Sequence, residues 1–199
     1  MKQLLVTISL VLCASMAAAE SGTDPNWPCI QRKQPHLSLG QVWTGPEPDD
    51  AIRKLASTPE IVQLAEKLEQ RRVTPEEIKA EVAAFAKTAD NQKLTALMVA
   101  IFERTDSYRT RLIDGIARYG HRQVSLSDQI EKRREKMEEL EKADKPDFDA
   151  IDAEEKALDW DTRIFTEGQQ SLTYVCDTPV LIEQRLFAIG REIATYLRK

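Results

Sequence analysis

After residue 49, apolar residues recur in the three- and four-residue steps that place one apolar stripe along an α-helix. The longest stripe occupies the segment 91–119. Its members are Leu94, Met98, Ile101, Thr105, Tyr108, Leu112, Ile116 and Tyr119. Gly120 follows at once and is predicted to end this helix as its C-terminal cap. No segment alternates convincingly between apolar and polar residues as a half-buried strand would, so the sequence predicts an all-α fold.

Three Thr-Pro pairs indicate further helix starts. They are Thr58-Pro59, Thr74-Pro75 and Thr178-Pro179. Threonine accepts a hydrogen bond from a free amide of the first turn, and proline suits the first helical position because the amide that it lacks has no partner there. We therefore expect helices to begin at residues 59 and 75, and a last helix to open at Thr178-Pro179.

The segment 126–175 has the pattern of a long antiparallel helical hairpin. Its first half, 126–143, is rich in Glu, Lys and Arg, and its narrow apolar stripe steps by about 3.5 residues, as in a coiled coil. Lys145-Pro146-Asp147 then predicts a turn. In the second half, the apolar residues Ile151, Leu158, Phe165 and Leu172 lie seven apart. We expect the tip of this hairpin to project, because it has the most charge and the fewest apolar residues.

The first 19 residues have the pattern of a cleavable secretory signal peptide. Lys2 precedes a short apolar segment, Leu4 to Leu12, and three small residues, 17–19, favour cleavage before Glu20. The apolar segment is too short to span a bilayer. We expect an exported protein, and the short charged start favours the bacterial periplasm over other secretory routes.

Residues 20–48 are expected to form an extended arm in front of a single helical domain, 49–199. Five of the nine prolines fall in this arm, and they interrupt regular helix. The arm also has Trp27 and Trp43, which a disordered segment would lack. Cys29 in the arm and Cys176 are the only cysteines after the signal peptide, so an oxidising compartment favours a disulfide between them.

The composition excludes some partners. The formal net charge is −5 and the isoelectric point is about 5.3, which argues against nucleic acid or an anionic membrane as the partner. No segment after the signal peptide is long and apolar enough for stable membrane insertion.

Few residues indicate catalysis or metal binding. The two histidines, His36 and His121, lack the neighbours of a catalytic triad, and neither has the Glu-x-x-His spacing of a di-metal bundle. In the acidic segment 147–161, Asp147, Asp149 and Asp152 are weak candidates for calcium ligands. It lacks the glycine and the terminal glutamate of a calcium loop, so acids at a helix start are the simpler interpretation. We expect neither catalysis nor a cofactor.

The sequence therefore favours a non-enzymatic, exported helical interaction protein, an adaptor or a chaperone-like factor. Its partner would be another protein, and the hairpin and the arm would be the contact surfaces. Candidate contact residues in the arm are Trp27, Trp43, Arg32 and Lys33. The alternative is a periplasmic ligand- or metal-binding helical domain that uses the groove between arm and bundle or the acidic segment. The sequence assigns neither an oligomeric state nor a known family.

Overall fold

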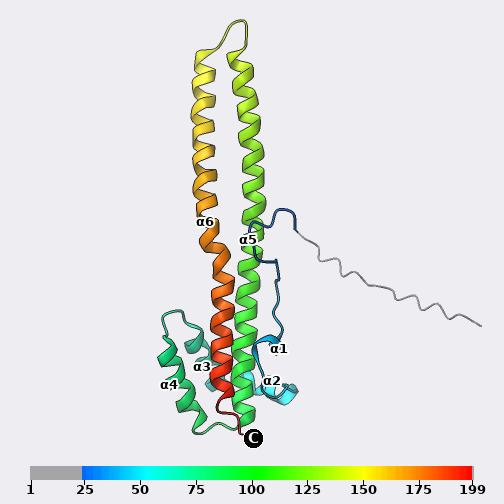
Figure 1. Ribbon diagram of the computed structural model, residues 1–199, viewed down its shortest axis with the longest axis vertical. Helices are drawn as coiled ribbons and strands as arrows, with labels where there is room; N and C mark the ends of the chain where they lie inside the picture. Colours follow the sequence, from blue (N-terminus) through cyan, green and yellow to red (C-terminus); the bar gives the residue numbers. More distant parts are fainter. Residues whose placement is uncertain (1–23, 199) are drawn as a thin grey trace, which may run out of the picture.

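Two long antiparallel helices dominate the fold (Figure 1). The computed structural model describes residues 24–198, so the predicted signal peptide and residues 20–23 lie outside the described range. Helix α5, Asn91–Glu141, and helix α6, Phe148–Ala194, lie side by side and are joined by a short turn at the predicted Lys145-Pro146-Asp147. All regular elements from residue 24 to 198 are helices, which confirms the all-α prediction and the antiparallel hairpin.

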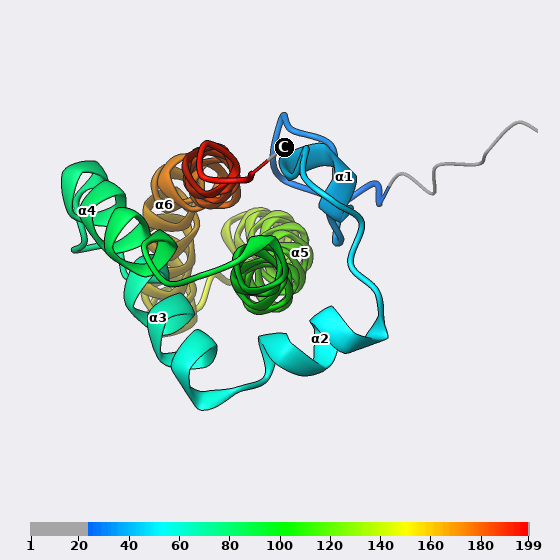
Figure 2. The ribbon, with the colours of Figure 1, turned by 90° about the horizontal axis from the view of Figure 1, so that it is seen from below.

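Four shorter helices surround one end of this pair (Figure 2). They are α1 (Leu39–Val42), α2 (Asp50–Ala56), α3 (Pro59–Glu69) and α4 (Pro75–Ala86). The predicted starts of α3 and α4 are confirmed, since each begins at the proline of its Thr-Pro pair. At α4, the Thr74 hydroxyl accepts a hydrogen bond from the Glu77 amide, and the Glu77 carboxylate accepts one from the Thr74 amide.

The hydrophobic core lies at the same end of the molecule. Helix α5 contributes its first turns, from Leu94 to Ile101, and α6 contributes its last turns, including Leu186, Ile189 and Ile193. Val42 and Trp43 of the arm, with residues of α2, α3 and α4, complete it. The far half of the hairpin extends beyond this core (Figure 1). Within residues 24–198, no helix is long and apolar enough to cross a membrane.

The prediction that Thr178-Pro179 opens a separate helix is wrong. Helix α6 continues through Pro179, which is buried inside it. The proline leaves the carbonyl four residues earlier without its helical hydrogen bond. The Thr178 hydroxyl, one residue before the proline, donates to the Tyr174 carbonyl at 3.1 Å, a contact that often accompanies a bend in a helix. Figure 1 shows a bend in α6 in the turns ahead of Pro179, as expected for a proline kink.

The prediction that Gly120 ends a helix is also wrong. Helix α5 continues beyond it to Glu141, and Gly120 is buried within it. The glycine is needed for a different reason: the arm crosses α5 at this point. A Cβ atom at position 120 would lie 2.3 Å from the Asn26 carbonyl oxygen and 2.8 Å from the Cδ of Pro28. The small residue therefore admits the arm and does not end the helix.

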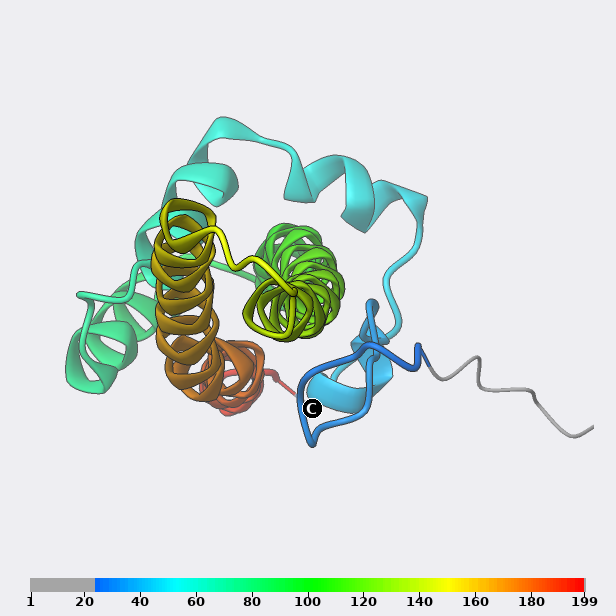
Figure 3. The same cartoon turned by 90° about the horizontal axis from the view of Figure 1, so that it is seen from above.

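The arm lies lengthwise along the α5–α6 pair (Figure 1), and the view along the long axis shows it on one side of the two helices (Figure 3). Alternate side chains from Gln31 to Leu39 are partly buried, and those between them are exposed, as expected for an extended chain on a surface. The predicted disulfide is confirmed: Cys29 is bonded to Cys176 of α6, with their Cα atoms 5.5 Å apart. Between the disulfide and the core, Arg109 of α5 donates to the carbonyls of Gln34 and Pro35.

Replacing Gly120 by alanine is expected to lower the free energy of unfolding by about 1–3 kcal/mol, because the added methyl group overlaps the arm backbone. Gly115 on the same helix is the matched control. A Cβ there meets only the Arg118 Nη2, at 3.9 Å, so Gly115→Ala should raise the free energy of unfolding by about 0.5–1 kcal/mol through helix propensity. Urea unfolding measures both changes. Equal, stabilising effects of the two substitutions would contradict the role given to Gly120.

Replacing both Cys29 and Cys176 by serine is expected to lower the free energy of unfolding by about 2–5 kcal/mol. The disulfide closes a loop with a sequence separation of 147 residues and so restricts the unfolded chain. Urea unfolding with and without a reductant measures the effect. The reductant should destabilise the wild-type protein to the level of the double variant and leave that variant unchanged.

Candidate functional site

A groove of about 660 Å³ lies between α3, α5 and α6. Its lining comes from three segments that are distant in sequence. The lining residues are Glu66, Glu69, Gln70 and Arg71 from α3 and its end, Arg104, Thr105 and Tyr108 from α5, and Thr178, Leu181, Ile182, Arg185, Leu186 and Ile189 from α6. We call this site the α3–α6 groove.

The floor of the α3–α6 groove is apolar and its mouth has exposed apolar residues. Leu186 and Ile189 form part of the floor, and both are 1% exposed. At the mouth, Tyr108 is 51% exposed and Leu181 is 55% exposed. Buried leucine and isoleucine stabilise the fold, whereas exposed large apolar side chains gain little from folding. The groove therefore has apolar surface available to a second molecule.

Ion pairs fix one wall of the groove. Arg104 of α5 lies 3.3 Å from Glu66 and 3.0 Å from Glu69, both on α3. Burial raises the pKa of the Glu69 carboxyl, and the Arg104 guanidinium opposes that change by favouring the charged form. These pairs connect α3 to α5 and give the groove a charged rim.

Arg185 of α6 closes the end of the groove. Its Nη2 donates to the carbonyls of Leu68, Gln70 and Val73 at 2.6–3.0 Å, where α3 ends. The Gln70 carbonyl also accepts a hydrogen bond from the Val73 amide at 3.0 Å, so Arg185 adds a side-chain donor to a turn that the backbone already closes. Arg185 therefore holds the α3–α4 connection against α6. Its Nε is buried and has no hydrogen-bond partner within residues 24–198.

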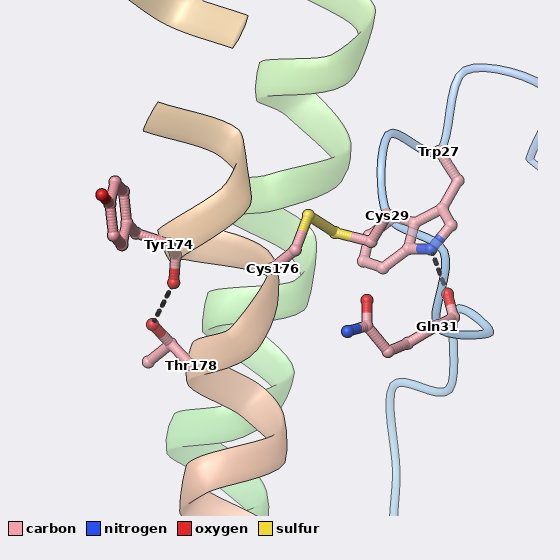
Figure 4. Close-up of a disulfide and its surroundings, with 6 residues drawn as sticks. All are labelled: Trp27, Cys29, Gln31, Tyr174, Cys176 and Thr178. Carbon is pink, nitrogen blue, oxygen red and sulfur yellow. Dashed lines mark hydrogen bonds between the residues drawn. A yellow bond between two sulfur atoms is a disulfide. The ribbon is translucent and has the colours of Figure 1, made fainter. Parts of the chain in front are cut away.

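A stripe of exposed apolar side chains continues from the groove along α6. Trp160 is 62% exposed, Ile164 41%, Tyr174 79% and Leu181 55%. Figure 4 shows Tyr174 pointing away from the arm, whereas Cys176 points toward it. The arm therefore covers one side of α6, and the apolar stripe lies on a side that the arm leaves open.

The candidate contact residues of the arm have different surroundings. Trp43 is 6% exposed, and its Nε1 donates to the Pro46 carbonyl inside the molecule. Trp27 is partly buried beside the disulfide, and its Nε1 donates to the Gln31 carbonyl (Figure 4). Lys33 pairs with Asp24 at 2.8 Å, and Arg32 is exposed. The two tryptophans thus hold the arm in place, and partner contact by Trp27, Trp43, Arg32 and Lys33 stays a prediction.

Two grooves lie between the arm and the bundle: one of about 560 Å³, where Val42 and Thr44 of the arm face the end of α6, and one of about 210 Å³ near the disulfide. The residues around the smaller groove include Arg109, Cys176 and Glu183. Arg109 is 4% exposed, and its Nε donates to Glu183 at 2.6 Å, so its charge is neutralised within the fold. The smaller groove thus connects the arm, α5 and α6, and the exposed Arg32 is a further charged residue of its lining.

The two histidines join the arm to α5. The Nδ1 atom of His36 lies 3.0 Å from Asp106 and 3.3 Å from the Thr110 hydroxyl. A catalytic triad needs the acid and the nucleophile on different ring nitrogens, so these contacts do not form one. His121 lies within α5 and contacts Asn26 and Asp24 of the arm.

The acidic residues of the segment 147–161 form caps, ion pairs and hydrogen bonds within the α5–α6 hairpin. Asp147 caps α6 by accepting from two amides of its first turn, and Asp152 pairs with Lys156. Glu154 is 5% exposed and Asp161 is 8% exposed, and both accept hydrogen bonds from Arg133 of α5. No cluster of three or more potential metal ligands occurs in the described part of the chain.

The sequence patterns missed the α3–α6 groove. Tyr108 fitted the apolar stripe of α5 and was expected in the core, although half of it is exposed. Leu181 and Trp160 do not belong to the predicted apolar stripes of their segments. Large apolar residues outside a helix's core-facing stripe were therefore the available signal for this surface.

Comparison of the chain with protein-family models, with curated proteins and with solved structures finds no match. The assignment of a function thus depends on the geometry of the groove, the stripe and the hairpin.

Lowering the pH is expected to weaken the hairpin through Glu154. Hydrogen bonds from Lys136 and Arg133 hold the pKa of Glu154 below its ordinary value. The ionised form therefore favours folding above the pKa of the unfolded chain, and this contribution is lost as the pH falls through the lower pKa of the folded chain. Urea unfolding at about pH 7 and about pH 3 measures the change.

The Glu154→Gln variant tests the origin of this pH dependence. It should be less stable than the wild type at neutral pH and should lose less stability on acidification. Glu155→Gln, which alters an exposed residue of the same helix and leaves the network intact, is the matched control. An equal pH dependence of Glu154→Gln and the wild type would contradict the role of the network.

Proposed function

We propose that this protein is an exported, non-enzymatic helical interaction protein, an adaptor or a chaperone-like factor, and that the α3–α6 groove binds an apolar segment of another protein. The observation that carries the proposal is the uncovered apolar groove, with Tyr108 and Leu181 exposed at its mouth. Grooves of this kind accept the apolar face of an amphipathic helix, whose anchor residues insert between the helices of the receptor.

The frame of the groove supports a preformed binding site. Arg104 connects α5 to α3, and Arg185 connects α6 to the end of α3. These contacts hold all three walls without a ligand. A preformed site loses less conformational entropy on binding than a flexible one, which favours affinity. The charged rim around an apolar centre also matches the usual composition of protein interfaces.

The disulfide and the first 19 residues support export. A disulfide between Cys29 and Cys176 persists in an oxidising compartment and is rare in the reducing cytosol. The signal-peptide pattern is an independent argument for the same location. The periplasm is the compartment that we propose.

Photo-crosslinking from the groove in the producing cells tests the proposed function. The amino acid p-benzoylphenylalanine is placed at Leu181, at the mouth of the groove, and the cells are irradiated. We expect a discrete adduct with a second protein, which mass spectrometry identifies. Placing the same amino acid at Gln169, an exposed position on another face of α6, should not give this adduct.

Two outcomes would contradict the proposal. One is the absence of any adduct with a different protein at Leu181. The other is an equal adduct from both positions, which would indicate nonspecific contact.

A further inference from the structure

The apolar stripe of α6 has a spacing that fits a second copy of the same helix. Trp160, Tyr174 and Leu181 are separated by fourteen and seven residues, so they lie at positions of a seven-residue repeat along one side of the helix, and Glu167, paired with Arg163, has the position between Trp160 and Tyr174. All three are more than half exposed, at 62%, 79% and 55%. In the inner stripe, Ile151, Leu158, Phe165 and Leu172 follow the same repeat and are partly buried. Helix α6 thus has one seam covered within its own chain and one left open.

We propose that α6 pairs with α6 of a second copy in an antiparallel, two-fold symmetric dimer, in which Trp160 of each copy enters the α3–α6 groove of the other. If Trp160 lies opposite Leu181 of the second copy, the symmetry axis passes between Gln170 and Ser171. Leu181 then lies opposite Trp160 as well, because a two-fold interface uses the same patch on both chains. This arrangement therefore covers both ends of the stripe, Trp160 and Leu181, in each copy.

The groove suits a tryptophan side chain. Its volume of about 660 Å³ has room for an indole ring, and its mouth is formed by Tyr108 and Leu181. Aromatic side chains bury a large apolar area, and tryptophan is enriched among the residues that dominate binding energy at interfaces. Trp160 therefore provides the anchor residue, and the groove provides its pocket.

The charges at the two ends of the stripe are of opposite sign. Near Trp160, the exposed face of the hairpin has four acids against two bases. These four acids and two bases are Asp149, Asp152, Glu155 and Asp159 and Lys156 and Arg163, and Glu167, the partner of Arg163, is a further exposed acid of α6. The groove has three arginines and two glutamates in its lining. In the antiparallel dimer the acidic hairpin of one copy lies against the more basic groove of the other, which selects this orientation over the parallel one.

The dimer and the proposed partner would occupy the same groove. The dimer itself does not depend on the proposed function. One consequence of the dimer does rest on the proposed function. If the groove binds an apolar segment of another protein, dimer formation blocks the groove until that partner displaces Trp160. The experiment below uses the protein alone, so its result is separate from the photo-crosslinking result.

Cysteine crosslinking of the purified protein tests the dimer. Ser171 lies next to the predicted axis and on the stripe, so Ser171→Cys should form a covalent dimer rapidly under mild oxidation. Gln169→Cys is the matched control: it is exposed too, but it lies about 200° from Ser171 around the helix and should crosslink slowly. The thiols introduced at position 171 of the two copies are close only if the helices pair as proposed.

Sedimentation equilibrium of the variants without added cysteines completes the test. The wild-type protein should reach dimer mass as its concentration rises, and Trp160→Ala should raise the dissociation constant by about thirtyfold. Because Trp160 is exposed, its replacement should leave the circular dichroism spectrum unchanged. A monomer at all concentrations, a dimer that Trp160→Ala does not weaken, or equal crosslinking at positions 169 and 171 would each overturn the proposal.

Discussion

The packing of α6 against α5 is the interaction on which the rest of the structure depends. Near the core, this contact is apolar: Leu186, Ile189 and Ile193 of α6 are buried with the first turns of α5. Farther along the hairpin, Ile130 is still buried, but charged groups are buried too, and Arg133 donates to Glu154 and Asp161 across the interface. Apolar burial stabilises the contact without fixing its register, whereas charged groups at low exposure must meet specific partners. The near half therefore contributes most of the stability, and the far half aligns the helices.

The remaining elements attach to this pair from two sides. The arm lies on one side, where the disulfide, Arg109 and the contact at Gly120 hold it. The chain from α2 to α4 passes around the other side, where Arg185 holds its middle. The arm extends along the pair as far as Gly120, but α2–α4 reach only the end that contains the core. The difference in reach leaves α6 uncovered beside the end of α3, and this is the position of the α3–α6 groove.

Local patterns in the sequence predicted the elements whose structure depends on neighbouring residues. The starts of α3 and α4, the turn at Lys145-Pro146-Asp147 and the helical class are of this kind. Gly120 and Pro179 were misinterpreted because glycine and proline each have two uses in helical proteins. One use ends or begins a helix, and the other occurs inside a helix, where a second segment or a kink requires the residue. Only the position of the arm, which is a tertiary contact, distinguishes the two uses at Gly120. The groove was missed for the same reason, because its walls come from three separate segments.

The uncovered side of α6 differs from an ordinary exposed helix face in its residues. Most of the exposed surface of the hairpin consists of Glu, Lys and Arg, which form ion pairs along each helix, such as Arg163 with Glu167. Trp160, Tyr174 and Leu181 interrupt that surface at a regular spacing and gain little from the folding of one chain. These three side chains would become buried only on contact with another molecule. A partner helix in the groove and a second α6 along the stripe both provide that contact, and the spacing of the three residues along one side of α6 favours a helix that lies alongside α6 over a compact ligand.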